Sequence, residues 1–138
     1  RSTPAGLKEY PLNVIELILG AGATFVARSY SRRLTHLKRI IREAVLHPGF
    51  SFVDVLQICA SFYNLTTWYD ERVYETSEEN ASLFEFACRA ASQWNYNDDS
   101  RIPLGIFYQV HRPLLPEKRT DMVIDRQAVI RSLIDEAR

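Results

Sequence analysis

The chain has 138 residues, a length that suits one domain with a single hydrophobic core. Apolar residues make up 46% of it, and 17 basic side chains balance 17 acidic ones, so no net field draws the chain to nucleic acid or to an anionic membrane. No apolar run reaches the roughly 18–20 residues that a membrane span needs. We therefore predict a folded protein with no nucleic-acid partner and no membrane partner.

The cysteine count and the first residue indicate where the chain belongs. Cys59 and Cys88 fall in different predicted elements, whereas a secreted disulfide framework normally carries more cysteines in a shorter chain. We therefore predict a reducing, cytoplasmic compartment. The sequence begins at Arg1 without a methionine, so we expect residues 1–138 to be one α/β domain from a longer polypeptide, with a tail or helix over about 114–138.

Helix and strand patterns alternate along the first part of the chain. Asn13, with Glu16 three residues later, resembles a capping box and predicts a helix over 14–19. A short β-rich run predicts a strand over 23–28. Apolar residues at helical spacing then predict a helix over 32–46.

The alternation continues to the end of the chain. Residues 50–56 are apolar almost throughout, which is typical of a strand covered on both faces. A polar and aromatic segment to about residue 80 is assigned no regular element, residues 82–94 predict a helix and residues 102–110 a third strand, and Asp125 is placed to cap a last helix. Strands spaced by helices imply crossovers, so we predict a three-layer α/β fold with a mostly parallel sheet, of which this chain supplies three strands.

The three histidines have ordinary structural explanations, and we predict no catalytic residue among them. His36 falls on or near the polar side of a predicted helix, and His111 lies just beyond a strand. His47 falls at a helix C-terminus, where the helix dipole favours a cation. Paired carboxylates in predicted polar loops are interpreted as solvated surface rather than as acid–base pairs. These pairs are Asp70-Glu71, Glu78-Glu79 and Asp98-Asp99.

Two arginines come at or after the ends of predicted strands. Arg28 closes the first strand and Arg112 follows the third. If the strands are parallel, both side chains lie at the carboxyl edge of the sheet, where together they could hold a carboxylate or a phosphate. A salt bridge to a loop acid is the simpler alternative.

Cys59 is the residue most indicative of chemistry. It follows an apolar strand and opens an aromatic, polar loop, a position that suits a thiolate ligand of iron. A four-iron cluster usually takes four thiolates, so the other three would come from elsewhere. A core residue and a nucleophile with a depressed thiol pKa are the alternatives. Cys88, on an amphipathic helix, is predicted to be a buried small hydrophobe.

Several blocks of sequence match one known family in the expected order. The blocks are Gly22-Ala23-Thr24-Phe25-Val26-Ala27-Arg28, Val53-Asp54-Val55-Leu56-Gln57-Ile58-Cys59, Trp68-Tyr69 with Glu71-Arg72-Val73-Tyr74, and Ile102-Pro103-Leu104-Gly105-Ile106-Phe107-Tyr108. They resemble the beta subunit of 2-oxoacid:ferredoxin oxidoreductases, and the resemblance extends to about Pro113.

The resemblance implies the C-terminal portion of a thiamine-diphosphate-binding fold. Such enzymes, with an alpha subunit as partner, oxidatively decarboxylate a 2-oxoacid such as 2-oxoglutarate or pyruvate, form an acyl-coenzyme A and pass electrons through a 4Fe-4S cluster to ferredoxin. The resemblance makes Cys59 the last cluster ligand, although Ile58 replaces the family's usual proline.

Other family motifs are missing from this sequence. The Gly-Asp-Gly-Asp motif for diphosphate and Mg²⁺, and the other cluster cysteines, precede this region in the family. We therefore expect the chain alone to be inactive. The alternative is a non-catalytic α/β interaction module that has lost the cofactor-binding half.

Overall fold

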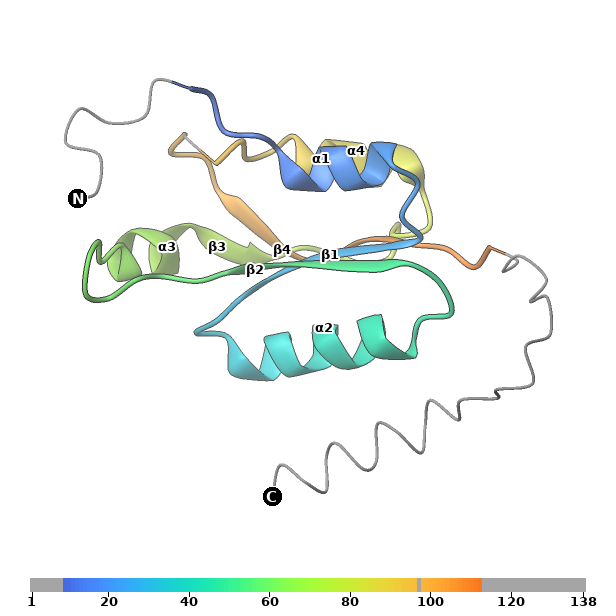
Figure 1. Cartoon of the computed structure of the whole chain (residues 1–138), viewed down its shortest axis with the longest axis horizontal. Helices are drawn as coiled ribbons and strands as arrows, with labels where there is room; N and C mark the ends of the chain where they lie inside the picture. Colours follow the sequence, from blue (N-terminus) through green and yellow to red (C-terminus); the bar gives the residue numbers. More distant parts are fainter. Residues whose placement is uncertain (1–8, 97, 113–138) are drawn as a thin grey trace, which may run out of the picture.

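The computed structural model describes residues 9–96 and 98–112 as a four-stranded sheet between two layers of helices. Figure 1 shows α1 and α4 on one face of the sheet and α2 on the other. None of the helices in these ranges is long and apolar enough to cross a membrane. In chain order the elements are α1 (Val14–Gly20), β1 (Phe25–Tyr30), α2 (Leu34–Leu46), β2 (Ser51–Leu56), α3 (Thr66–Arg72), β3 (Val73–Glu75), α4 (Phe84–Ala91) and β4 (Ile102–Gln109).

The sheet is mixed, with strand order β2-β1-β4-β3. β1 pairs with β2 in parallel and β3 pairs with β4 in parallel, but β1 and β4 are antiparallel. The predicted three-layer α/β class and the mostly parallel sheet are therefore confirmed. β4 lies between β1 and β3 and runs parallel to β3 but opposite to β1. The expectation that every crossover gives a parallel neighbour is therefore wrong for β4.

The short elements α3 and β3 fall in the segment to which the sequence assigned no regular structure. α3 has no buried residue, so it lacks the apolar stripe that reveals a helix. β3 has three residues, too few to show an alternating pattern. The predicted C-terminal helix capped by Asp125 lies outside the described residues.

The core lies on both faces of the two central strands. Phe25 and Ala27 of β1 pack with Ile40 of α2, whereas Val26 packs on the other face with residues of α1 and α4. β1 is buried throughout, but β2 is only partly buried. The prediction of a strand covered on both faces over 50–56 is wrong because β2 is an edge strand of the described sheet.

Asn13 performs the predicted capping function and also connects two helices. Its side-chain oxygen accepts a hydrogen bond from the backbone N–H of Glu16 at 3.2 Å. Its amide nitrogen donates to the Ala91 carbonyl at 3.0 Å and to Asn95 Oδ1 at 2.9 Å. The same residue therefore begins α1 and fixes it against the end of α4.

A bulge in β4 is held by Glu78. The β1–β4 register shifts between Val26 and Ala27, and Glu78 Oε1 accepts a hydrogen bond from the Ile106 N–H at 3.0 Å. Arg39 of α2 donates two hydrogen bonds to the same carboxylate, at 2.7 and 2.9 Å. The prediction of a solvated surface pair is therefore wrong for Glu78, which joins α2 to the sheet.

We predict that Gly105→Ala lowers the free energy of unfolding by about 1–3 kcal/mol. Gly105 has φ +134°, and an added Cβ would lie 3.0 Å from Glu78 Oε1. Thermal or urea unfolding measures the loss. Gly20→Ala is the control, because no atom lies within 4 Å of its added Cβ, and a comparable loss there would contradict the explanation.

We predict that Glu78→Gln lowers stability at neutral pH and that the difference from wild type fades on acidification. Burial alone would raise the pKa of Glu78, but the Arg39 hydrogen bonds, the Ile106 N–H and the Arg39 charge together hold it below its usual value. A lowered folded-state pKa adds stability above the unfolded value of about 4.3 and loses it as pH falls through the folded value. Unfolding free energies from pH 7 down to acid measure this, and a pH-independent difference would contradict it.

Candidate functional site

Cys59 lies in the loop that leaves the carboxyl end of β2, three residues after Leu56. The loop curls back on itself through a bridge between Cys59 and Tyr63, in which the Tyr63 N–H donates to the Cys59 carbonyl at 3.2 Å. The Cys59 side chain is exposed and is a free thiol. The predicted position, at a strand end and accessible, is the one observed.

The loop backbone favours the thiolate form of Cys59. Hydrogen bonds from the backbone amides of Phe62 and Ser61, and a weaker one from Tyr63, lower the pKa of the thiol, while slight burial opposes them. The thiolate is the form that binds metal and that acts as a nucleophile. Amide hydrogen bonds to sulfur are also a means by which proteins tune iron–sulfur clusters. The donor chemistry at Cys59 therefore fits a cluster ligand.

The described residues supply one such ligand and not a complete set. Within the described ranges no group of three or more His, Cys, Asp or Glu side chains is placed to hold a metal ion. Cys88 is exposed on α4, so the prediction that it is a buried hydrophobe is wrong. The small buried residues of α4 are Ala87, Ala90 and Ala91, which leaves Cys88 on the outer side of that helix.

Ile58 anchors the Cys59 loop to the core. It packs against a cluster that includes Tyr30 and Leu56, from the ends of β1 and β2, together with Trp94. Trp68 and Tyr69 of α3 pack on the same cluster. An apolar anchor directly before Cys59 holds the start of the loop while the thiol itself remains accessible.

Arg28 is fully buried within β1 and forms a polar network beside this cluster. Its Nε donates to Asp54 Oδ2 at 2.8 Å and its Nη2 donates to the Tyr96 hydroxyl at 2.7 Å. The Tyr96 hydroxyl in turn donates to the same Asp54 oxygen at 2.8 Å. The guanidinium carbon lies 5.0 Å from the Trp94 ring centroid and 5.1 Å from that of Tyr96. Carboxylate and aromatic rings together compensate the buried charge.

Tyr96 fits this role because of its environment. Burial raises the pKa of its hydroxyl, so the group stays protonated and can donate to Asp54. Tyr96 has φ +67°, an uncommon backbone conformation for a non-glycine residue. Tyr96 is not among the residues that the sequence predicted for the site. The available signal was Asp54, an acid inside an otherwise apolar strand, which required a buried cation.

The predicted pair of anion-binding arginines does not form. Arg28 is internal to β1 and forms a salt bridge, as the alternative predicted, but its partner Asp54 belongs to strand β2 and not to a loop. Because β4 is antiparallel to β1, its carboxyl end meets the amino end of β1, and Arg112 lies near Gly22 instead.

The histidines lie in structural positions. His36 is buried, so the prediction that it faces the polar side is wrong; it hydrogen-bonds Ser29 Oγ at 2.9 Å, and burial lowers its pKa. His47 ends α2 as predicted. Burial, with a contribution from His111, lowers its pKa and so disfavours the cation that the dipole explanation requires. The ring instead hydrogen-bonds Thr24 Oγ1 at 2.8 Å.

The exposed acids agree with the surface interpretation. Asp70 pairs with Arg32 at 3.3 Å on the exterior, and Asp99 accepts from Trp68 Nε1 at 3.1 Å. Asp98 accepts from the Ser100 N–H at 2.9 Å. None of these contacts joins two carboxylates into an acid–base pair.

Known proteins of one family match this chain, including the Cys59 loop. Residues 59–122 match the family model for the C-terminal region of the pyruvate ferredoxin oxidoreductase beta subunit, and the match begins at the candidate ligand itself. Beta subunits of 2-oxoacid:ferredoxin oxidoreductases from a Sulfolobus species and from Aeropyrum pernix are 36% and 38% identical over 112 and 109 residues. The alignments cover 71% and 70% of this chain and 35% of each relative, so the chain spans about a third of their length.

A solved structure supports the fold. It is a 2-oxoglutarate:ferredoxin oxidoreductase from Magnetococcus marinus, with 2-oxoglutarate, coenzyme A and succinyl-CoA bound, that matches with a TM-score of 0.72 and 24% identity. The match covers 98% of this chain and 43% of the other. The fold and the sequence matches thus define an α/β domain that is similar to part of an oxidoreductase subunit. The chain is homologous to the C-terminal portion of 2-oxoacid:ferredoxin oxidoreductase beta subunits, which confirms the predicted resemblance.

We predict that Asp54→Asn destabilises the protein by about 3–5 kcal/mol, because it leaves a buried guanidinium without its counter-ion. Chemical unfolding measures the change. The control is Glu85→Gln, whose partner Arg89 is solvated on the surface of α4 and whose loss should cost less than about 1 kcal/mol. Equal effects of the two substitutions would contradict the assigned role of Asp54.

Proposed function

We propose that this chain is the C-terminal part of the beta subunit of an enzyme that oxidatively decarboxylates a 2-oxoacid to an acyl-coenzyme A. The substrate is a 2-oxoacid such as 2-oxoglutarate or pyruvate, and the electrons leave through a 4Fe-4S cluster to ferredoxin. The observation that carries the proposal is Cys59, an exposed thiol with a pKa lowered by backbone amides, at the first residue of the matched family region.

Cys59 is assigned as one thiolate ligand of the cluster. The amides of Phe62 and Ser61 donate to its sulfur, which stabilises the negative charge and favours ligation over protonation. Ile58 holds the loop on the core, so that the sulfur keeps its position relative to β2. Electron transfer depends on this fixed placement and on the hydrogen bonds that set the potential.

Thiamine diphosphate and Mg²⁺ are assigned to the portion of the longer subunit that carries the phosphate-binding motif. When bound, thiamine diphosphate supplies the carbanion chemistry that decarboxylation requires. The proposed partners are the alpha subunit, ferredoxin, coenzyme A and the 2-oxoacid, and the proposed location is the cytoplasm. Both described cysteines are free thiols, which is compatible with that compartment.

The test uses the full-length gene product prepared without air together with its partner subunit. We predict that Cys59→Ala removes or strongly weakens a reducible four-iron electron paramagnetic resonance signal and lowers iron content, since one of four thiolates is lost. Cys88→Ala, also an exposed cysteine, is the matched control and should leave both readouts unchanged.

The remaining outcomes separate the alternatives. Iron that is unchanged by Cys59→Ala, or never present, would reject ligation and favour the non-catalytic interaction module. Loss of activity with an intact cluster signal, together with alkylation of Cys59 at low pH, would instead favour a nucleophilic thiol.

A further inference from the structure

The loop that carries Cys59 exposes a large aromatic side chain beside the thiol. Residues 59–64 are all exposed, and the side chain of Phe62 is 82% exposed in the described part of the chain. Figure 1 shows this loop, between β2 and α3, at one end of the molecule, beyond the helix layers that cover the sheet. The phenyl ring is therefore open to contact from another protein surface.

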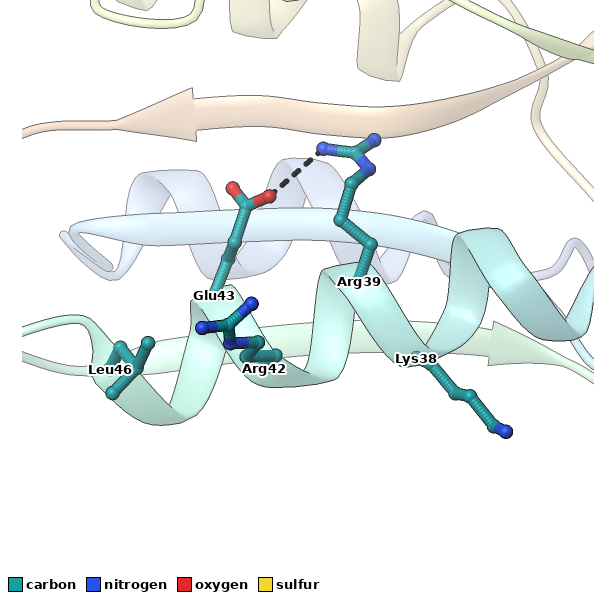
Figure 2. A pocket seen from close by; sticks show the side chains of 5 residues that line it. All are labelled: Lys38, Arg39, Arg42, Glu43 and Leu46. Carbon is teal, nitrogen blue, oxygen red and sulfur yellow. Dashed lines mark hydrogen bonds and ion pairs between the residues drawn. The ribbon is translucent and has the colours of Figure 1, made fainter. Parts of the chain in front are cut away.

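Exposure alone does not single out Phe62, because scattered apolar side chains on a surface are common. Leu46 of α2 is 57% exposed and lines a hollow of about 350 Å³, shown in Figure 2. Phe50 is 59% exposed. Both lie at the amino end of β2, where Ser51 Oγ donates to the Ala44 carbonyl of α2 at 2.8 Å. The whole of β2, about 20 Å at its strand rise per residue, separates them from the thiol loop.

What distinguishes Phe62 is its fixed place against the sulfur. Its backbone N–H and that of Ser61 donate hydrogen bonds to Cys59 Sγ, and the Tyr63 N–H donates to the Cys59 carbonyl. Ile58 holds the start of the loop on the core. The Phe62 side chain thus branches from the backbone directly beside the thiol, so its ring lies next to any group that the sulfur binds.

The number of thiolates that a cluster needs brings a second protein surface to the same place. A four-iron cluster usually takes four thiolates, and the sequence holds only two cysteines. Cys88 lies on the outer side of α4, away from this loop. If Cys59 is a ligand, as the proposed function on which this inference rests requires, the other three thiolates belong to a surface that approaches Cys59 to within the width of the cluster. That surface meets Phe62.

We propose that Phe62 is the aromatic anchor of the interface between this domain and the protein surface that carries the other three thiolates, and that its burial there shields the cluster from water. Aromatic residues are enriched among the few side chains that dominate interface energetics. Burial of the ring removes apolar area from water and so stabilises the contact. Exclusion of water also keeps the reduction potential low, because water would stabilise the extra negative charge of the reduced cluster.

The first test measures hydroxyl-radical labelling of Phe62 in the full-length gene product, prepared without air together with its partner subunit. Mass spectrometry compares the labelling rate of this residue in the folded and the denatured protein. We expect labelling to be about tenfold slower or more in the folded protein, because interface anchors are fully desolvated. A ring that is labelled at nearly the denatured rate would overturn the proposal. This test needs no substitution, so a variant that fails to fold cannot obscure it.

The second test compares Phe62→Ala with Phe50→Ala, which removes an exposed phenyl ring at the other end of β2. Phe62→Ala should speed the loss of iron to a chelator about tenfold and should raise the reduction potential of the cluster, because its cover is lost. Phe62→Leu keeps an apolar cover and should remain close to the unsubstituted protein. Phe50→Ala should change neither readout.

The outcomes separate this inference from the proposed function. Unsubstituted protein that never holds iron would reject both. An intact cluster whose rate of iron loss and potential change no more in Phe62→Ala than in Phe50→Ala would reject the anchor role and leave ligation by Cys59 standing.

Discussion

The buried charge of Arg28 is the constraint on which the arrangement of this domain depends. Arg28 and Asp54 are direct partners in the parallel register of β1 and β2, and their side chains meet at 2.8 Å. A slip of one residue would turn Asp54 to the other face of the sheet and leave the guanidinium unpaired. Because Cys59 follows Asp54 by five residues, the ion pair that sets the register of β2 also sets where the thiol loop begins.

A second polar contact performs a similar task on the other face of the sheet. Glu78 accepts a hydrogen bond from the Ile106 N–H at the β4 bulge and two from Arg39 of α2. A bulge leaves a backbone group without its ladder partner, and a carboxylate that is itself paired satisfies it at little electrostatic cost. The Arg28–Asp54 pair thus holds β2 against β1 on one face of the sheet. On the other face, the Arg39–Glu78 pair holds α2 against the β4 bulge.

The loop around Cys59 combines rigid support with access. Ile58 is held by the aromatic cluster, and the amides that follow Cys59 turn back toward its sulfur. An exposed thiol with preorganised donors suits ligation to a group supplied by another part of the protein. This arrangement is compatible with a chain that matches about a third of the length of its relatives. In the proposed function, the domain would contribute one placed ligand to a larger site.

Local patterns in the sequence were sufficient for the capped helix at Asn13, for the amphipathic helix α2, for the central strands and for Cys59 at a strand end, because each depends on spacing or on neighbours within a few residues. The tertiary structure alone decided the direction of β4, the formation of β3, and the environments of His36, Glu78 and Cys88. Strand direction depends on which backbone edge is free to pair, and burial depends on what another element brings against a side chain. Ser29, the partner of His36, and Arg39, the partner of Glu78, belong to other elements of the fold. The pattern of a single helix or loop therefore does not reveal them.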